Sequence, residues 1–138
     1  MDDNEFRQAL AVLEAYQRQL ENFSGQAEIL RMSLDDALRA RDTLQAVADA
    51  KAGDDLLIPI GSGAFVHASV SKKRSAVVGV GSRVSVEKDL AAAVEFMKTS
   101  IAEITDALKK ADAAIKEVDE AVRKLSPVVQ QEYQRRQQ

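Results

Sequence analysis

Two long stretches of heptad-patterned residues constrain the fold of this chain more than any other feature. In residues 2–52, apolar side chains recur at alternating spacings of three and four, which aligns them in one stripe along a helix. Residues 87–138 repeat this pattern. A single heptad helix leaves its stripe exposed to water, so each stretch requires a partner helix. Because the two stretches are similar in length and flank a short joint, the pattern predicts an antiparallel coiled coil within one chain.

The stripe of the first stretch is apolar except at Arg41, which we expect to lie near Glu95 and to fix the register of the helix pair. The stripe of the second stretch contains no polar residue as far as Val129. The first stripe comprises Phe6, Ala9, Leu13, Tyr16, Leu20, Phe23, Ala27, Leu30, Leu34, Ala37, Leu44 and Ala48, and the second comprises Leu90, Val94, Met97, Ile101, Ile104, Leu108, Ala111, Ile115, Val118, Val122, Leu125 and Val129.

The segment between the two stretches follows a different pattern. It contains five of the six glycines, and its apolar residues alternate with period two over residues 56–86. This pattern predicts four short strands, with turns at Gly61-Ser62-Gly63 and Gly81-Ser82. The expected fold class is mainly α with a small β module: a long antiparallel α-helical coiled-coil hairpin joined by two β-hairpins.

These patterns predict a single domain covering residues 1–138. We expect its first coiled-coil helix over residues 1–53, its two β-hairpins over 54–86, and its second coiled-coil helix over 87–138.

Capping residues mark the ends of the expected helices. Asp2 and Glu5 have the spacing of a capping box, in which each side chain bonds the other's backbone N–H. Gly53 is expected to stop the first helix, with the cation of Lys51 in its last turn. Asp89 is expected in the first turn of the second helix, where the helix dipole favours negative charge.

The strands are too short to bury their apolar faces against one another. Open strand edges and apolar faces require a partner, so we interpret the β module as an assembly interface. The residues expected to form this interface are Ile58, Ile60, Val66, Val70, Val78, Val80, Val84 and Val86.

Apolar residues also gather near both chain ends, partly off the coiled-coil stripe. Pro127 removes one helix hydrogen bond, so we expect the last turns of the second helix to kink or fray and to expose neighbouring side chains. The candidate binding residues at these arm tips are Phe6, Leu10, Val12, Leu13, Val128, Val129 and Tyr133. Frayed helix ends without a binding role are the alternative interpretation.

The sequence offers little support for catalysis, and we expect a protein that is not an enzyme. Cysteine is absent, and His67 is the only histidine, so no metal site or cofactor is expected. The glycine turns lack the continuation of a phosphate-binding loop. The basic residues Lys72-Lys73-Arg74 favour a solvated turn over a contact with an acidic partner.

Charge and hydropathy also limit the partners. A net charge of −3 argues against general nucleic-acid binding. No apolar run has the ~18 residues needed to span a membrane. Because the chain begins with acidic residues, we expect no signal peptide and a cytoplasmic protein.

The middle segment resembles the prefoldin family, specifically the alpha class found in archaea. The resemblance rests on Ile58-Pro59-Ile60-Gly61-Ser62-Gly63-Ala64-Phe65-Val66 and on Val78-Gly79-Val80-Gly81, followed by Val86-Glu87-Lys88. The order of helix, two hairpins and helix resembles the family over the whole chain. The beta class has a single hairpin, so four expected strands favour the alpha class.

The resemblance implies an ATP-independent chaperone subunit in a hetero-hexamer of two alpha and four beta subunits. Their hairpins would form a barrel-like platform, and the arm tips would hold non-native client proteins and deliver them to a group II chaperonin. The family's client contacts would correspond to Phe6, Leu10, Leu13, Val129 and Tyr133. The alternative is a homo-oligomeric coiled-coil scaffold or tether.

Overall fold

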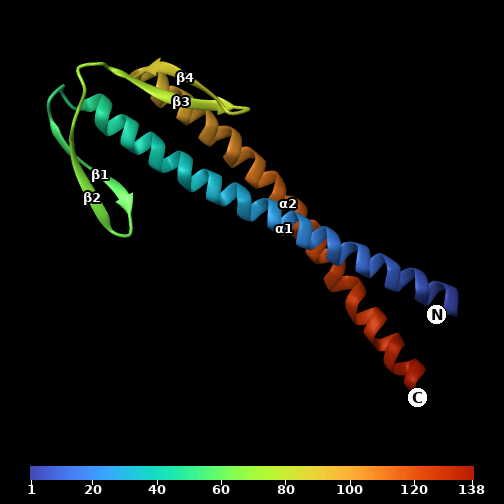
Figure 1. Ribbon diagram of the computed structural model, residues 1–138. Helices are drawn as coiled ribbons and strands as arrows, with labels where there is room; N and C mark the ends of the chain where they lie inside the picture. Colours follow the sequence, from blue (N-terminus) through green and yellow to red (C-terminus); the bar gives the residue numbers. More distant parts are fainter. The chain divides into compact units, whose positions relative to one another are not determined.

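The computed structural model describes residues 1–138 and confirms the expected fold class of two long helices with two β-hairpins between them (Figure 1). In chain order the elements are α1 (Asp3–Asp49), β1 (Asp55–Gly61), β2 (Ala64–Ser69), β3 (Ser75–Gly81), β4 (Val84–Asp89) and α2 (Leu90–Gln137).

The four strands form two separate antiparallel sheets, β1 with β2 and β3 with β4. The central cross-strand pairs are Ile58 with Val66 and Val78 with Val86. Both hairpins turn through three successive residues with positive φ angles, Gly61-Ser62-Gly63 and Gly81-Ser82-Arg83. Glycine adopts these angles without a steric penalty. The predicted turns are therefore confirmed, and Arg83 is the position where the second turn carries a larger side chain.

The chain divides into two compact units. The first unit contains Met1–Ser33 and Ile104–Gln138. Its two helical segments are antiparallel, because Asp3 pairs with Arg136 while Arg31 pairs with Asp112. Small and β-branched side chains of the seam, such as Ala27 and Val118, are buried between them.

The second unit contains Leu34–Glu103, with the end of α1, both hairpins and the start of α2. Its buried side chains come from all three parts. They are Ala37 on α1, Val70 and Val78 in the β module, and Leu90, Ala93 and Val94 on α2.

The start of each helix is capped by an aspartate. In α1, Asp2 Oδ1 accepts a hydrogen bond from Glu5 N at 2.8 Å, and Asp2 N donates to Glu5 Oε2 at 3.1 Å, which confirms the expected capping box. In α2, Asp89 Oδ1 accepts from Ala92 N at 2.7 Å. Asp89 is therefore the N-cap, and α2 begins at Leu90 rather than at residue 87 because β4 continues through Asp89.

The end of α1 differs from the expectation. The helix ends at Asp49, four residues before Gly53, and its last turn contains no basic residue. The carbonyl oxygens left without helical partners at this end are bonded instead by Arg74, from the segment between the hairpins. Arg74 Nη2 donates to the carbonyl oxygens of Val47, Ala48 and Ala50 at 3.2, 2.9 and 3.1 Å.

The expected contact of Arg41 and the expected fraying at Pro127 are wrong. Arg41 pairs with its neighbour Asp42, and Glu95 pairs with Lys98, so the Arg41–Glu95 contact is absent. Pro127 neither ends nor frays α2, which continues to Gln137. Because Pro127 lies at the exposed surface, water can bond the carbonyl oxygen of Arg123 that loses its N–H partner.

Candidate functional site

The terminal tip, defined as residues 1–13 with 128–138, exposes three of the seven predicted binding residues. Val12, Val128 and Tyr133 are 43%, 45% and 55% exposed. Phe6, Leu10 and Leu13 are half-buried. The expected exposure of Val129 is wrong: it occupies a seam position and is buried. The open apolar surface of the tip is therefore smaller than the sequence indicates.

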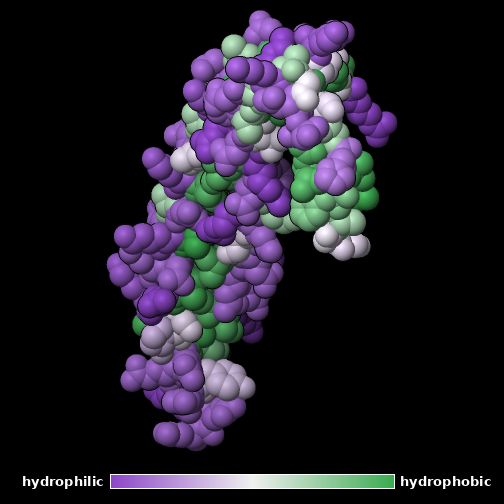
Figure 2. Space-filling model, turned by 90° about the vertical axis from the view of Figure 1, so that its left-hand side faces the viewer, coloured by the Kyte–Doolittle hydropathy of each residue, from purple (hydrophilic) through white to green (hydrophobic).

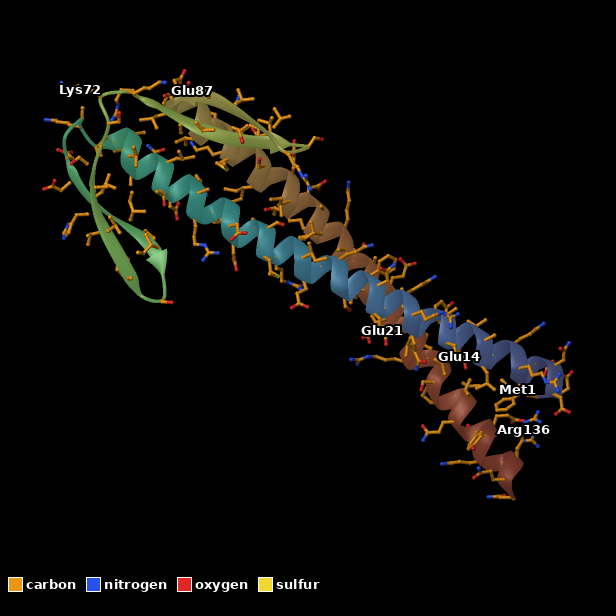
Figure 3. The ribbon with its side chains drawn as sticks, viewed as in Figure 1. Met1, Glu14, Glu21, Lys72, Glu87 and Arg136 are labelled. Carbon is orange, nitrogen blue, oxygen red and sulfur yellow. The ribbon has the colours of Figure 1, made fainter.

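A charged network closes the seam of the terminal tip. The Glu132 carboxylate is the chain's only buried charged group, and it accepts hydrogen bonds from Arg135 Nη2 at 2.6 Å and Arg136 Nε at 3.0 Å. The hydrogen bond from Arg135 is the main cause that lowers the pKa of Glu132 to about 2, against the opposing effect of burial. Arg136 also bonds Asp3 and donates from Nη2 to the carbonyl oxygen of Met1 at 3.1 Å. Figure 3 shows Met1 and Arg136 close together at the ends of their helices.

The cation of Arg136 lies over the ring of Phe6. Its Cζ atom is 4.6 Å from the ring centroid, within the range of a cation–π contact. We call Asp3, Phe6, Glu132 and Arg136 the clasp, because this group joins the first turn of α1 to the last turns of α2.

The second hairpin has one apolar and one largely polar face. Strand register places Val78 opposite Val86 on the apolar face, with Ala76 and Val80 further along the same face of β3. Val78 is already buried within the single chain, whereas Val80, Val84 and Val86 remain exposed. The open part of the expected interface on this hairpin therefore consists of Val80, Val84 and Val86, and the role of Val78 in assembly stays a prediction.

The first hairpin exposes apolar side chains on both faces. Ile58 and Val66 are opposite each other on one face, and Leu57 and Phe65 lie on the other. All four are exposed, as is Ile60. Val70, which was also expected at the interface, is buried within the single chain. Figure 2 shows apolar surface gathered in limited areas of an otherwise largely hydrophilic chain.

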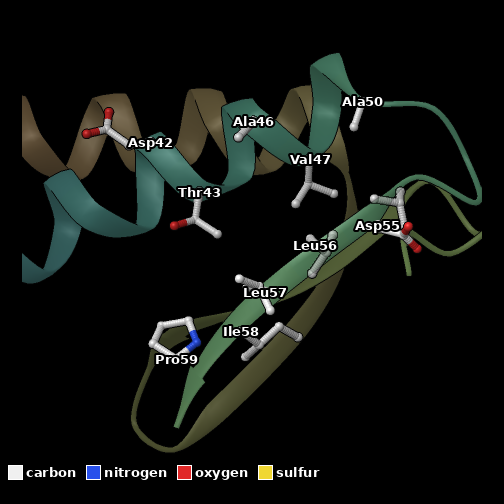
Figure 4. A pocket seen from close by; sticks show the side chains of 11 residues that line it. Asp42, Thr43, Ala46, Val47, Ala50, Asp55, Leu56, Leu57, Ile58 and Pro59 are labelled. Atoms are coloured by element: carbon white, nitrogen blue, oxygen red, sulfur yellow. The ribbon is translucent and has the colours of Figure 1, made fainter. Parts of the chain in front are cut away.

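A groove of about 610 Å³ separates the first hairpin from the end of α1. Thr43, Ala46 and Val47 line it from the helix, and Leu56 and Ile58 line it from β1 (Figure 4). The groove has room for several apolar side chains and is open in the single chain. An unfilled apolar groove beside exposed strands is the arrangement expected of a subunit whose partner completes the packing.

The sequence patterns did not identify several exposed apolar residues. Leu57, Phe65 and Val77 lie on strand faces that were not assigned to the assembly interface, and Ile29 and Met32 lie on the outer face of α1. The signal for Leu57 was present in the continuous apolar run of β1, and Phe65 of β2 lies on the same face of the first hairpin. The heptad pattern offered no signal for Ile29 and Met32, because neither lies on the stripe.

The basic turn is partly engaged within the chain. Lys73 Nζ pairs with Glu87 at 2.7 Å, and Ser75 Oγ donates to the same carboxylate at 2.8 Å. These hydrogen bonds, that of Lys73 first, hold the pKa of Glu87 below its usual value. Arg74 is hydrogen-bonded to α1, so Lys72 is the only one of the three cations without an ion pair or a side-chain hydrogen bond. Figure 3 labels Lys72 and Glu87.

None of the helices combines the length and apolar character that crossing a membrane would require.

The sequence of this chain is similar to a protein-family model and to known proteins. The family model described as "Prefoldin subunit" matches residues 16–135. The prefoldin subunit alpha of Methanoregula boonei is 32% identical over 133 residues, covering 96% of this chain and 86% of the relative. The prefoldin subunit alpha of Methanothrix thermoacetophila is 31% identical, covering 78% of this chain and 71% of the relative.

A solved structure has the same fold. The cryo-EM structure of filamentous PFD from Methanocaldococcus jannaschii aligns with a TM-score of 0.65 at 24% identity, covering 88% of this chain and 98% of that chain. The long match to the family model and the identity to alpha-subunit relatives show that the chain belongs to the prefoldin family, in its alpha class.

Proposed function

We propose that this chain captures non-native proteins at its terminal tip, without ATP, and delivers them to a group II chaperonin. As a prefoldin subunit the chain is part of a co-chaperone, and the family consists of chaperone subunits rather than enzymes. The proposed assembly is a hetero-hexamer of two alpha and four beta subunits, and its proposed compartment is the cytoplasm.

The observation that carries the proposal is the exposure of apolar side chains at the terminal tip. Val12, Val128 and Tyr133 lie outside the buried seam and have no covering element in the chain. A surface that holds many different unfolded chains must offer apolar area without a rigid pocket, because a rigid pocket would select one partner. Each tip would bind weakly, and several tips in one assembly would bind together through high effective concentration.

The exposed hairpins support assembly through the β module. Ile58, Ile60 and Val66 on the first hairpin, and Val80, Val84 and Val86 on the second, present apolar area next to unpaired strand edges. Pairing with other subunits would cover these faces and fill the groove beside α1.

The test is suppression of aggregation of a denatured client, without ATP, by the chain with and without a beta-class partner. The triple variant Val12→Ser, Val128→Ser and Tyr133→Ser should assemble normally and lose most of its protection. The matched control is Ile29→Ser with Met32→Ser, because these residues are 65% and 63% exposed on the same helix pair but outside the terminal tip.

Equal protection by the tip variant and the unsubstituted chain would contradict client capture at the tip. An assembly that forms without any beta-class subunit and gives no protection would favour the alternative function, a homo-oligomeric scaffold.

A further inference from the structure

The final seam positions of α2 hold charged residues in place of apolar ones. The heptad series of α2 reaches Val129 at an a position, so the next d and a positions are Glu132 and Arg136. Glu132 is only 8% exposed, although carboxylates are almost never this buried unless they are paired. A charge in the seam provides less stability than an apolar residue there, which suggests a role other than packing.

Arg136 has partners on both helices. It bonds Glu132 within α2, and Asp3 and the Met1 carbonyl oxygen at the start of α1. The side chain of Arg136 is only 29% exposed, although that of its partner Asp3 is 82% exposed, so the pair is less solvated than one with two exposed partners. These charge-assisted hydrogen bonds hold the guanidinium in one place.

The guanidinium of Arg136 is held against the face of the Phe6 ring. An aromatic ring offers the largest apolar contact of any side chain near the start of α1, and the guanidinium covers one face of it at 4.6 Å. A client side chain that stacked on this face would have to displace Arg136.

We propose that the clasp is an autoinhibitory contact: Arg136 covers Phe6 in the free tip, and Phe6 binds a client only after Arg136 has moved away. This inference rests on the proposed capture of clients at the terminal tip. The closed clasp lowers the apolar area that free tips present to one another, and an apolar client segment opens it by competing for the ring.

The test compares client affinity across single substitutions in the full-length chain assembled with a beta-class subunit. The probe is a fluorescently labelled, reduced and carboxymethylated lactalbumin, which cannot fold. Arg136→Ala should tighten its binding by about two- to five-fold, the free-energy range of a solvent-accessible cation–π contact. The matched control is Arg135→Ala, which removes the same charge and also a bond to Glu132, but leaves Phe6 covered.

Two further measurements separate uncovering of the ring from other effects. Phe6→Ser added to Arg136→Ala should cancel the gain in affinity. Raising the salt concentration from about 50 mM to about 500 mM should tighten binding more for the unsubstituted chain than for Arg136→Ala, because salt weakens the ion pairs of the clasp. Should Arg136→Ala lower the helix content, Asp3→Asn removes one partner of Arg136 and should give the same direction of change.

Unchanged or weaker binding by both Arg136→Ala and Asp3→Asn would overturn the clasp proposal, as would an equal gain from Arg135→Ala. The proposed function fails separately, if the Val12, Val128 and Tyr133 substitutions leave capture intact.

Discussion

Arg74 connects the β module to the end of α1, and its removal should loosen this junction measurably. The last carbonyl oxygens of a helix have no intrahelical partner, and α1 has no basic residue in its own last turn. Arg74 Nη2 lies within 3.2 Å of three of the carbonyl oxygens at this end. Its backbone oxygen also accepts from Leu90 N at 3.2 Å, so the same residue contacts the start of α2.

The expected free-energy cost of Arg74→Ala depends on how many hydrogen bonds its Nη2 atom can donate. Nη2 carries two hydrogens, so at most two of its three contacts are full hydrogen bonds. A hydrogen bond involving a charged group contributes about 1.5–3 kcal/mol, but water can replace it at this exposed site. With a helix-dipole contribution of about 0.3–1 kcal/mol, we expect Arg74→Ala to cost about 2 kcal/mol locally.

Amide hydrogen exchange measures this local cost. Gly53 N donates to Val70 O, and Val70 N donates to Asp54 O, so these two amides report whether the segment after α1 stays paired with Val70, directly after β2. A loss of 2 kcal/mol should speed their exchange about 30-fold. Arg74→Lys should give part of the effect, since an ammonium keeps the charge but lacks the planar fork.

The matched control for charge is Lys72→Ala, two residues away in the same turn. Lys72 has no ion pair, so its loss should leave both amides unchanged. If Arg74→Ala and Lys72→Ala give the same exchange rates, Arg74 does not hold the end of α1 and the reasoning is wrong.

Three further predictions concern the tip, the first helix and the hairpins. Because the folded pKa of Glu132 is about 2 and its ordinary value is 4.5, its contribution to stability is complete above pH 4.5 and is lost as the pH falls toward 2. Helix content measured against pH should fall more in the unsubstituted chain than in Glu132→Gln, where the carboxylates of Asp3 and Glu87 still titrate. Gly25→Ala should stabilise α1 by about 1 kcal/mol, because the added Cβ meets no atom within 4 Å; thermal unfolding would contradict this by showing no increase in Tm. Val80→Lys should release monomers or small species in size-exclusion chromatography with helix content preserved, and unchanged oligomers would argue against the hairpin interface.

The patterns that repeat over many residues predicted the fold well. Heptads in both arms and alternation in the middle identified the two helices and four strands, and glycines identified both turns. The expected contacts of single side chains were less accurate. Arg41 bonds an adjacent aspartate rather than Glu95, since a long flexible side chain can reach a carboxylate of its own helix.

The cation at the end of α1 could not be predicted from residues near the helix end in sequence. Lys51 is near this end in sequence, and a helix C-terminus favours a nearby cation. The structure supplies this cation from Arg74, more than twenty residues further along the chain. Helix-capping rules use short sequence spacings, so they cannot identify a cap that depends on where the first hairpin returns the chain.

The terminal tip shows a different limit, because the relevant signal was present in the sequence. The apolar residues of the α2 seam end at Val129, but the heptad positions continue to Glu132 and Arg136. Counting seam positions, rather than apolar residues, would have placed both charges opposite the start of α1, where the structure has Asp3 and Phe6. Since a charge at a seam position must be paired to be tolerated, heptad position alone predicts a partner for Glu132. It does not predict that Arg136 covers Phe6, which depends on the register of two helices and the direction of one side chain.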